Sequence, residues 1–243
     1  MRPSKKIWPA VLAVCLLAAL SSGTIYGYFL HRNHLFPYRL LNPIVPQSIG
    51  SADPWQWPWF RMRYDIIAAF PVHADVVMLG DSLTEGAGWR AMLPGIDVTN
   101  QGIVGDTTVG LLLRIDLAKR ASPRVVALMI GVNDLLTDQP VDEVHARYAK
   151  AISELASPGR CIIVQSTLLT RRGATVNAAI SHLNQRLAQT CAEGKCSFVD
   201  LNADLAPDGE LASDATVDGI HLTARGYTLW RDALLPHLAA CDH

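Results

Sequence analysis

Several features that would place a chain in a common functional class are missing from this sequence. The formal net charge is -1 and no block of Lys and Arg occurs, so the chain lacks the basic surface that binds nucleic acid. It contains neither a Gly-Lys-Ser/Thr phosphate loop nor a Gly-x-Gly-x-x-Gly turn. It also has no His-Glu-x-x-His motif and no paired Cys/His ligand spacing. We therefore expect no nucleic-acid partner, no metal and no cofactor.

A charge-free apolar stretch runs from Ile7 to Leu30 and is long enough to cross the hydrocarbon core of a bilayer as a helix. Lysine and arginine residues precede it, and positive charge at this place favours a cytoplasmic N-terminus. We therefore expect a membrane anchor through residues 7–30, with the rest of the chain outside the cytoplasm, either periplasmic or at the cell surface. Small residues around Ala19 leave cleavage as a signal peptide, and hence secretion, as the alternative.

The sequence divides into three parts. Residues 31–58 are rich in Pro and Trp and have no clear periodicity, as expected of a juxtamembrane linker. The tryptophans at 55, 57 and 59 either lie at the level of lipid headgroups or pack onto the domain that follows. The predicted parts are an anchor or signal segment at 1–30, the linker at 31–58 and one globular domain at 59–243.

Four cysteines lie beyond the apolar stretch, and an oxidising compartment would allow them to pair. Cys191 and Cys196 flank a tight segment between a predicted helix and a predicted strand, so they are the favoured pair. With Cys161 and Cys241 included, three pairings are possible, and four free thiols are a further alternative. The sequence does not indicate an oligomeric state.

Short runs rich in Val and Ile alternate with longer helical stretches throughout the predicted domain. Because these runs are apolar on both faces, they predict a parallel sheet that is covered by helices on both sides. The predicted strands are 75–80, 96–100, 124–130, 161–166 and 197–200, and the predicted helices are 59–70, 108–119, 141–155, 175–191 and 223–238. The predicted fold class is α/β, a three-layer α/β/α sandwich with a mostly parallel five-stranded sheet.

Polar motifs follow the predicted strands, at the sheet edge that carries the site in such folds. Ser82, in the sequence Gly-Asp-Ser-Leu, comes directly after the first strand, so its hydroxyl can project from this edge as an activated nucleophile. Gly105 and Asn133 follow the second and third strands, where a backbone N–H and a side-chain amide can donate to an oxyanion. Each of these motifs alone is also ordinary helix-cap or turn chemistry.

The fourth motif, Asp218-Gly-Ile-His221, precedes the last predicted helix. A serine nucleophile needs a general base, and a carboxylate three residues from a histidine can accept the second N–H of its ring. The four motifs occur in one order at strand ends, which indicates a single site. The predicted catalytic residues are Ser82, Asp218 and His221, and the predicted oxyanion hole consists of Ser82, Gly105 and Asn133.

These residues resemble the SGNH hydrolase superfamily, also called the GDSL esterase/lipase family. Gly-Asp-Ser-Leu at 80–83, Gly105, the Gly-x-Asn-Asp that contains Asn133, and Asp-x-x-His at 218–221 correspond to its four blocks. Within the superfamily the chain is most similar to the branch that contains platelet-activating-factor acetylhydrolase. The resemblance implies a flavodoxin-like fold, no metal, and ester hydrolysis through an acyl-enzyme intermediate.

The expected function is therefore that of a serine esterase acting on short acyl or acetyl esters of a small molecule, a glycan or a lipid. An extracytoplasmic O-acyltransferase acting on glycans and a lysophospholipase are the enzymatic alternatives, because the same residues serve all three reactions. A membrane-anchored binding module that keeps the fold without activity is the non-enzymatic alternative.

Overall fold

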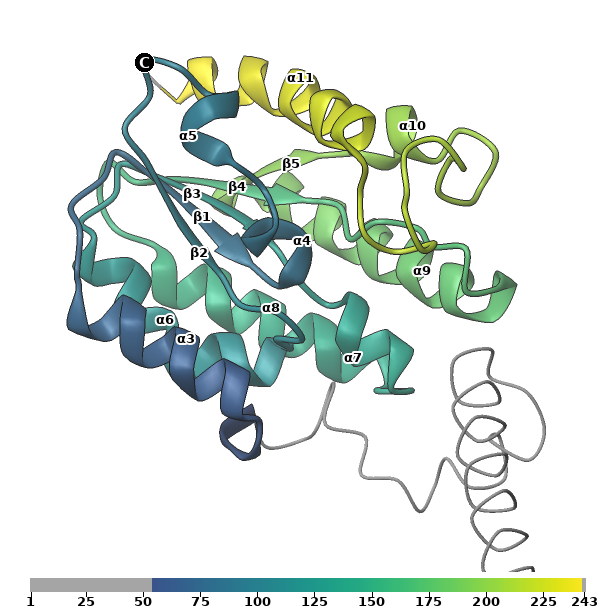
Figure 1. Cartoon of the computed structure of the whole chain (residues 1–243), viewed down its shortest axis with the longest axis horizontal. Coiled ribbons are helices and arrows are strands. Elements are labelled where there is room, and N and C mark those ends of the chain that lie inside the picture. The colour runs from purple at the N-terminus through teal and green to yellow at the C-terminus, as the bar shows by residue number, and fades with distance from the viewer. Residues whose placement is uncertain (1–53, 242–243) are drawn as a thin grey trace, which may run out of the picture. The chain divides into compact units, whose positions relative to one another are not determined.

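The computed structural model describes residues 54–241, in which five strands form one sheet (Figure 1). The strand order is β2-β1-β3-β4-β5, and all four strand pairs are parallel. The strands are β1 (Val76–Gly80), β2 (Val98–Gly102), β3 (Val125–Met129), β4 (Cys161–Gln165) and β5 (Ser197–Val199). The predicted α/β class with a five-stranded sheet is confirmed, and the order is that of flavodoxin-like folds.

In this described region, five long helices and several short ones connect or flank the strands. The long helices are α3 (Pro58–Ala69), α6 (Thr108–Arg120), α8 (Val141–Leu155), α9 (Ala174–Thr190) and α11 (Ala224–Ala240). The short elements are η1 (Pro54–Gln56), α4 (Ser82–Glu85), α5 (Trp89–Met92), α7 (Val132–Leu136), η2 (Cys191–Lys195) and α10 (Asn202–Leu205). The long helices match the predicted ranges to within two residues at each end.

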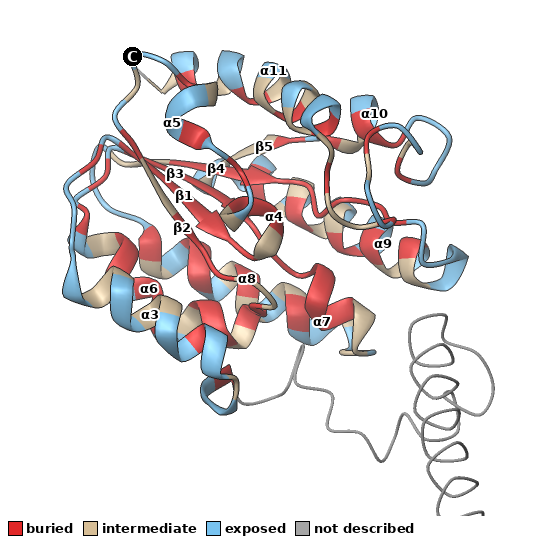
Figure 2. Ribbon diagram, in the orientation of Figure 1, coloured by how far each residue is buried: buried red, intermediate tan, exposed pale blue. Residues whose placement is uncertain are grey.

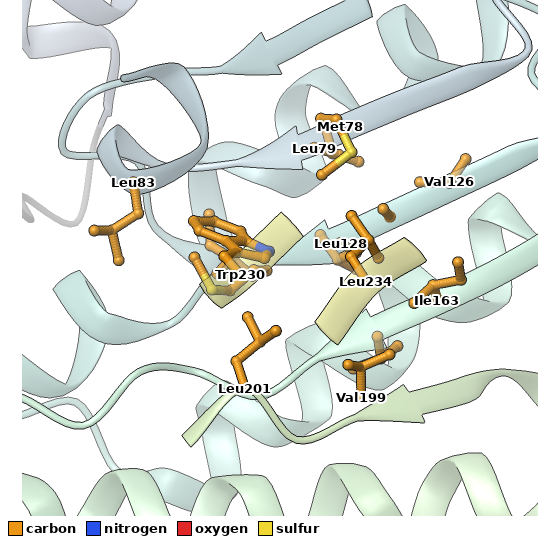
Figure 3. Close-up of a cluster of buried hydrophobic side chains, with 14 of the residues drawn as sticks. Met78, Leu79, Leu83, Val126, Leu128, Ile163, Val199, Leu201, Trp230 and Leu234 are labelled. Carbon is orange, nitrogen blue, oxygen red and sulfur yellow. The ribbon is translucent and has the colours of Figure 1, made fainter. Parts of the chain in front are cut away.

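Helices cover both faces of the sheet, and the core lies between them and the strands (Figures 1 and 2). On one face lie α3, α6 and α8; α11 lies on the other. Every residue of β1 and β3 is buried, which is why these strands read as uninterrupted apolar runs in the sequence. Figure 3 shows Trp230 and Leu234 of α11 beside Leu128 of β3. The Trp230 ring also meets Trp89 of α5 edge to face at 5.1 Å.

Among the strands, β2 shows the largest difference between the predicted range, 96–100, and the observed range, Val98–Gly102. Its second half is polar, and polar residues are weak indicators of a buried strand. In the structure the amide of Asn100 donates to the carbonyls of Thr84, Glu85 and Ala87, and the buried Gln101 amide donates to Leu117. These side chains bind neighbouring backbone groups that only the tertiary fold brings to them.

The N-terminal boundary of the folded region lies at or before Pro54. Pro54 is buried, and Trp55 contacts the rings of Phe60 and Tyr64 at 5.5 and 4.8 Å. Residues 54–57, which the sequence assigns to the linker, therefore pack onto the domain. The predicted membrane segment at 7–30 and most of the linker lie outside the described residues. Within residues 54–241, no helix has the length and apolar character of a membrane span.

Two disulfides join the four cysteines of the described region. Cys191 bonds to Cys196, which is the pair that the sequence favours, and Cys161 bonds to Cys241. The second bond closes 80 residues and connects the start of β4 to the end of α11. The helix that follows His221 is therefore attached to the sheet covalently at its far end.

Candidate active site

The turn after β1 presents Ser82 at the carboxyl edge of the sheet. β1 ends at Gly80, where a Cβ atom would lie 2.2 Å from the carbonyl oxygen of Met129, so the close approach of β1 and β3 requires glycine. Asp81 then caps α4, its Oδ1 accepting the N–H of Leu83 at 3.0 Å. Ser82 is the first residue of α4 and is partly exposed. Its backbone N–H consequently lies at a helix N-terminus, which favours a developing negative charge.

A chain of hydrogen bonds joins Ser82, His221 and Asp218. The Ser82 Oγ lies 3.0 Å from His221 Nε2, and His221 Nδ1 lies 2.7 Å from Asp218 Oδ2. Partial burial of Asp218 favours its protonated form, but the hydrogen bonds from His221 and Ile220 outweigh it and lower the pKa of this carboxyl. An ionised carboxylate at this position fixes the ring tautomer that leaves Nε2 free to accept the serine proton.

The loop that carries Asp218 and His221 is fixed by backbone contacts. The Thr216 hydroxyl donates to the carbonyl of His221 at 2.7 Å, and the N–H of Arg171 donates to the carbonyl of Gly219 at 2.8 Å. Gly219 has φ +89°, a conformation that side chains other than glycine rarely adopt. The backbone conformation of this loop therefore explains why a glycine stands between Asp218 and His221.

The other two predicted residues meet at the loop between β2 and α6. Gly105 has φ +71°, and the buried amide of Asn133 donates to the carbonyl of the next residue, Asp106, at 2.9 Å. This bond uses one N–H of the amide and leaves the second for another acceptor. The same loop is bound to α4, because Glu85 accepts the N–H of Val104 at 2.5 Å.

The profile of the GDSL-like Lipase/Acylhydrolase family matches residues 78–229. The chain belongs to this family. The match includes all five residues that the sequence singles out, and the family is one of lipases and acylhydrolases.

Relatives of this GDSL-like protein fall into two groups by sequence. The N-acylneuraminate cytidylyltransferase of Streptococcus agalactiae serotype V is 31% identical over 155 residues, which are 63% of this chain and 36% of that protein. The chain thus spans about a third of the length of that relative. Human platelet-activating factor acetylhydrolase IB subunit alpha2 is 26% identical over 203 residues, with 76% of this chain and 83% of that protein covered.

Solved structures show the same fold at lower identity. A GDSL-like lipase of Bacteroides thetaiotaomicron matches with a TM-score of 0.66 and 21% identity, over 74% of this chain and 97% of that chain. The acetylxylan esterase Axe2 of Geobacillus stearothermophilus matches with a TM-score of 0.59 and 19% identity, over 70% of this chain and 95% of that chain.

Sequence reasoning about this GDSL-like chain missed Arg114, which lies under the site. Arg114 is 1% exposed, and it forms an ion pair with Asp106 at 2.7 Å. Its guanidinium also donates to the carbonyls of Gln101 at 2.7 Å and Gly80 at 2.8 Å. A single side chain thus connects the ends of β1 and β2 to the loop that contains Gly105. An arginine within an amphipathic helix gives no indication of this role.

A second buried carboxylate, Asp134, fixes the start of α6. It accepts the hydroxyl of Thr108 at 2.6 Å and the N–H of the same residue at 3.0 Å, and Arg147 lies 3.6 Å away. Because Asp134 follows Asn133 directly, this contact also sets the position of the Asn133 amide. The sequence assigned a role to Asn133 and none to Asp134, although both belong to the Gly-x-Asn-Asp block.

Trp57 covers the loop that contains Gly105. A Cβ atom at Gly105 would lie 2.3 Å from the Trp57 ring, so the indole occupies the space in which a side chain would stand. The neighbouring Pro54 and Phe60 approach Gly110 in the same way. The lead-in segment before α3 thus packs against the predicted oxyanion loop, which no sequence motif indicates.

We expect Trp57→Ala to lower kcat toward a soluble chromogenic ester about ten- to a hundred-fold, because a shift of about 1 Å in a positioning loop has effects of that size. KM should change much less, since the indole acts on the loop and not on substrate affinity. Trp57→Phe should retain most of the rate. The exposed Trp59→Ala is the matched control, and equal kcat values for Trp57→Ala and this control would contradict the role.

The buried carboxyl of Asp81 should make the stability of the protein depend on pH. Burial raises the pKa of Asp81 to about 7, and its Oδ2 has no hydrogen-bond partner among residues 54–241. A raised folded-state pKa favours folding while the carboxyl is protonated, and this contribution is lost as the pH rises from about 4 through about 7. Asp81→Asn should therefore stabilise the protein more at pH 8 than at pH 5, by about 2–3 kcal/mol at about 1.4 kcal/mol per pKa unit.

Urea unfolding at the two pH values measures this difference for Asp81. The exposed carboxylate Asp65, changed to Asn, is the control and should give the same free energy of unfolding as the parent at both values. A gain for Asp81→Asn that is independent of pH would show that Asp81 is ionised throughout.

Proposed function

We propose that the chain is a serine esterase that hydrolyses short-chain acyl or acetyl esters through an acyl-enzyme intermediate. The observation that carries the proposal is the continuous hydrogen-bonded chain from Ser82 through His221 to Asp218. A hydroxyl, an imidazole and a carboxylate in this order can activate the hydroxyl as a nucleophile at neutral pH.

In the proposed reaction, Ser82 Oγ attacks the ester carbonyl while His221 Nε2 takes its proton. The tetrahedral oxyanion accepts hydrogen bonds from the backbone N–H groups of Ser82 and Gly105 and from the free N–H of the Asn133 amide. The C–O bond to the alcohol then breaks, and His221 gives its proton to the leaving oxygen. Water repeats the sequence on the acyl-enzyme, which releases the acid and restores Ser82.

The exposure of the site supports a small acyl group. The side chains of His221 and Asp218 are 44% and 42% exposed, so the ester bond lies close to solvent. An open site of this kind admits an ester on a bulky alcohol, whereas a long acyl chain would need an apolar enclosure. Two matched proteins are named for acetyl esters, an acetylxylan esterase and a platelet-activating factor acetylhydrolase subunit.

The comparisons favour a sugar as the alcohol part of the ester, so an O-acetylated sugar is the first substrate class to test. Axe2 is named as an acetylxylan esterase, and the Streptococcus agalactiae relative is named for N-acylneuraminate. Cytidylyl transfer itself is not proposed, because the chain covers only 36% of that relative. Acyl transfer to a glycan and lysophospholipid hydrolysis use the same residues and are distinguished by the products that form.

We further propose that the domain lies outside the cytoplasm, anchored by residues 7–30, with secretion after cleavage as the alternative. The charge-free stretch with basic residues before it supports an anchor of this orientation. Pairing of Cys161 with Cys241 and of Cys191 with Cys196 is consistent with an oxidising compartment.

Ser82→Ala should abolish hydrolysis and leave the fold intact, because the hydroxyl contributes little packing. The assay is a panel of p-nitrophenyl esters from acetyl to palmitoyl, run beside an O-acetylated polysaccharide and a lysophospholipid. We expect the highest kcat/KM with the shortest acyl groups. Retention of esterase activity close to that of the parent by purified Ser82→Ala would refute Ser82 as the nucleophile, whereas a small residual activity above the uncatalysed rate is expected from the oxyanion donors alone.

Asp218→Asn should lower kcat by roughly 10⁴-fold, as the same change does in the catalytic triad of serine proteases, because the amide can present a donor where the ring requires an acceptor. His221 would then carry its proton on the nitrogen that faces Ser82. The loss should become smaller at high pH, where hydroxide partly replaces the base. A loss of only a few-fold at neutral pH would show that another group orients His221.

A further inference from the structure

Exposed apolar side chains are concentrated on and around α3. Of the nine large hydrophobic residues that are exposed in the described part of the chain, six lie between Trp55 and Val72. Four of them recur at intervals of three and four residues and therefore form one stripe, with Trp59, Met62 and Ile66 on the helix and Phe70 at its C-cap. We call these four residues the α3 stripe. Its last member, Phe70, is 74% exposed.

The stripe is not needed for the core of the domain. α3 packs through Phe60, which is fully buried, and through Tyr64, whose ring stacks on Phe60 at 6.4 Å. Figure 2 shows exposed residues along the outer side of α3. An apolar patch that the fold leaves uncovered is typical of an interaction surface.

We propose that the α3 stripe docks on the headgroup region of the membrane that anchors the chain. This rests on the proposed anchor at residues 7–30 and not on the proposed esterase activity. The chain between Leu30 and Pro54 comprises residues 31–53, which reach at most about 80 Å when fully extended. A tether of this length keeps the stripe at a high local concentration of lipid, so weak contacts suffice for docking.

The chemistry of the stripe matches that of a bilayer surface. Trp59 stands at one end and Met, Ile and Phe residues follow, which is the composition of helices that lie in the membrane interface. The exposed charges nearby are of both signs, and Arg61 and Asp65 on α3 with Arg120 on α6 give a net charge of only +1. Apolar contact should therefore drive docking, and lipid charge should matter little.

Docking by α3 would also place the site near the lipid. Trp57, which covers Gly105, directly precedes the first turn of α3 and lies two residues before Trp59. The Trp59 end of the stripe is thus the end closest to the predicted oxyanion loop. An ester presented at the membrane surface would reach this end of the domain first.

The test uses the full chain in phosphatidylcholine vesicles, with Cys15→Ser so that the introduced cysteine is the only one besides the four that form the two disulfides. A single cysteine carries a nitrobenzoxadiazole probe at Ile66→Cys, and the matched control carries it at Thr228→Cys, an exposed position on α11. Lipids with a quencher near the headgroup should reduce the emission at position 66 by about half or more, because interfacial helices lie about 5–10 Å into the headgroup boundary. Position 228 should remain unquenched.

Two further measurements make the result specific. The added substitutions Met62→Ser and Phe70→Ser should release the probe at position 66 from the lipid, whereas raising the salt concentration should not. Equal emission and quenching at positions 66 and 228 would overturn the proposal. The proposal would also be overturned if the emission at position 66 rose with the protein density on the vesicles and did not respond to the lipid quencher. That result would show that a second copy of the chain, and not lipid, covers the stripe. Esterase activity toward a soluble ester should be unchanged in every labelled protein. The result of the docking test is therefore independent of the result of the Ser82→Ala test.

Discussion

The buried ion pair between Arg114 and Asp106 is the interaction on which the candidate site depends most. Arg114 also donates to Gly80 and Gln101, so one guanidinium holds the ends of two adjacent strands and the loop beyond the second. Burial raises the pKa of Asp106 to about 6, while the charge and hydrogen bond of Arg114 oppose that rise. Removing one partner of such a pair leaves an uncompensated buried charge, at a cost of about 3–5 kcal/mol.

The position of this pair explains why it matters to the site. Gly80 precedes the turn that presents Ser82, and Asp106 follows Gly105 and accepts the Asn133 amide through its carbonyl. Three of the residues proposed to surround the reacting carbonyl are therefore fixed relative to one another by bonds that start from one arginine. Preorganised donors of this kind need no rearrangement during reaction, and this is the main source of oxyanion stabilisation.

The remaining two residues, Asp218 and His221, are held by a separate set of contacts. Their loop is fixed by Thr216 and Arg171, and α11 after it is joined to β4 by a disulfide. The part that carries Asp218 and His221 meets the part held by Arg114 at α4. There His221 bonds to the Ser82 hydroxyl, and the hydroxyl of Tyr227 donates to the Leu83 carbonyl at 2.9 Å. The site is thus assembled from two separately stabilised parts that meet at the edge of the sheet.

The sequence by itself determined the fold class, the order of the elements and the five residues singled out for the site. Strands buried on both faces are apolar throughout, and long helices keep their period, so both are visible in the chain. The carboxyl ends of parallel strands share one edge, which is why motifs far apart in sequence could be assigned to one place. The polar half of β2 was misplaced because Asn100 and Gln101 are satisfied only by backbone groups that the fold brings near.

The tertiary structure alone decided which polar groups support the site. Arg114 and Trp57 carry no sequence pattern of their own, since an arginine on a helix and a tryptophan in a Pro-rich segment are both common. Asp134 belongs to the Gly-x-Asn-Asp block, but that pattern does not show which groups the carboxylate binds. The polar contacts of Arg114 and Asp134 join groups up to 34 residues apart in the chain. Local sequence sets which backbone conformations are favourable, whereas the pairing of a buried charge depends on the whole chain having folded around it.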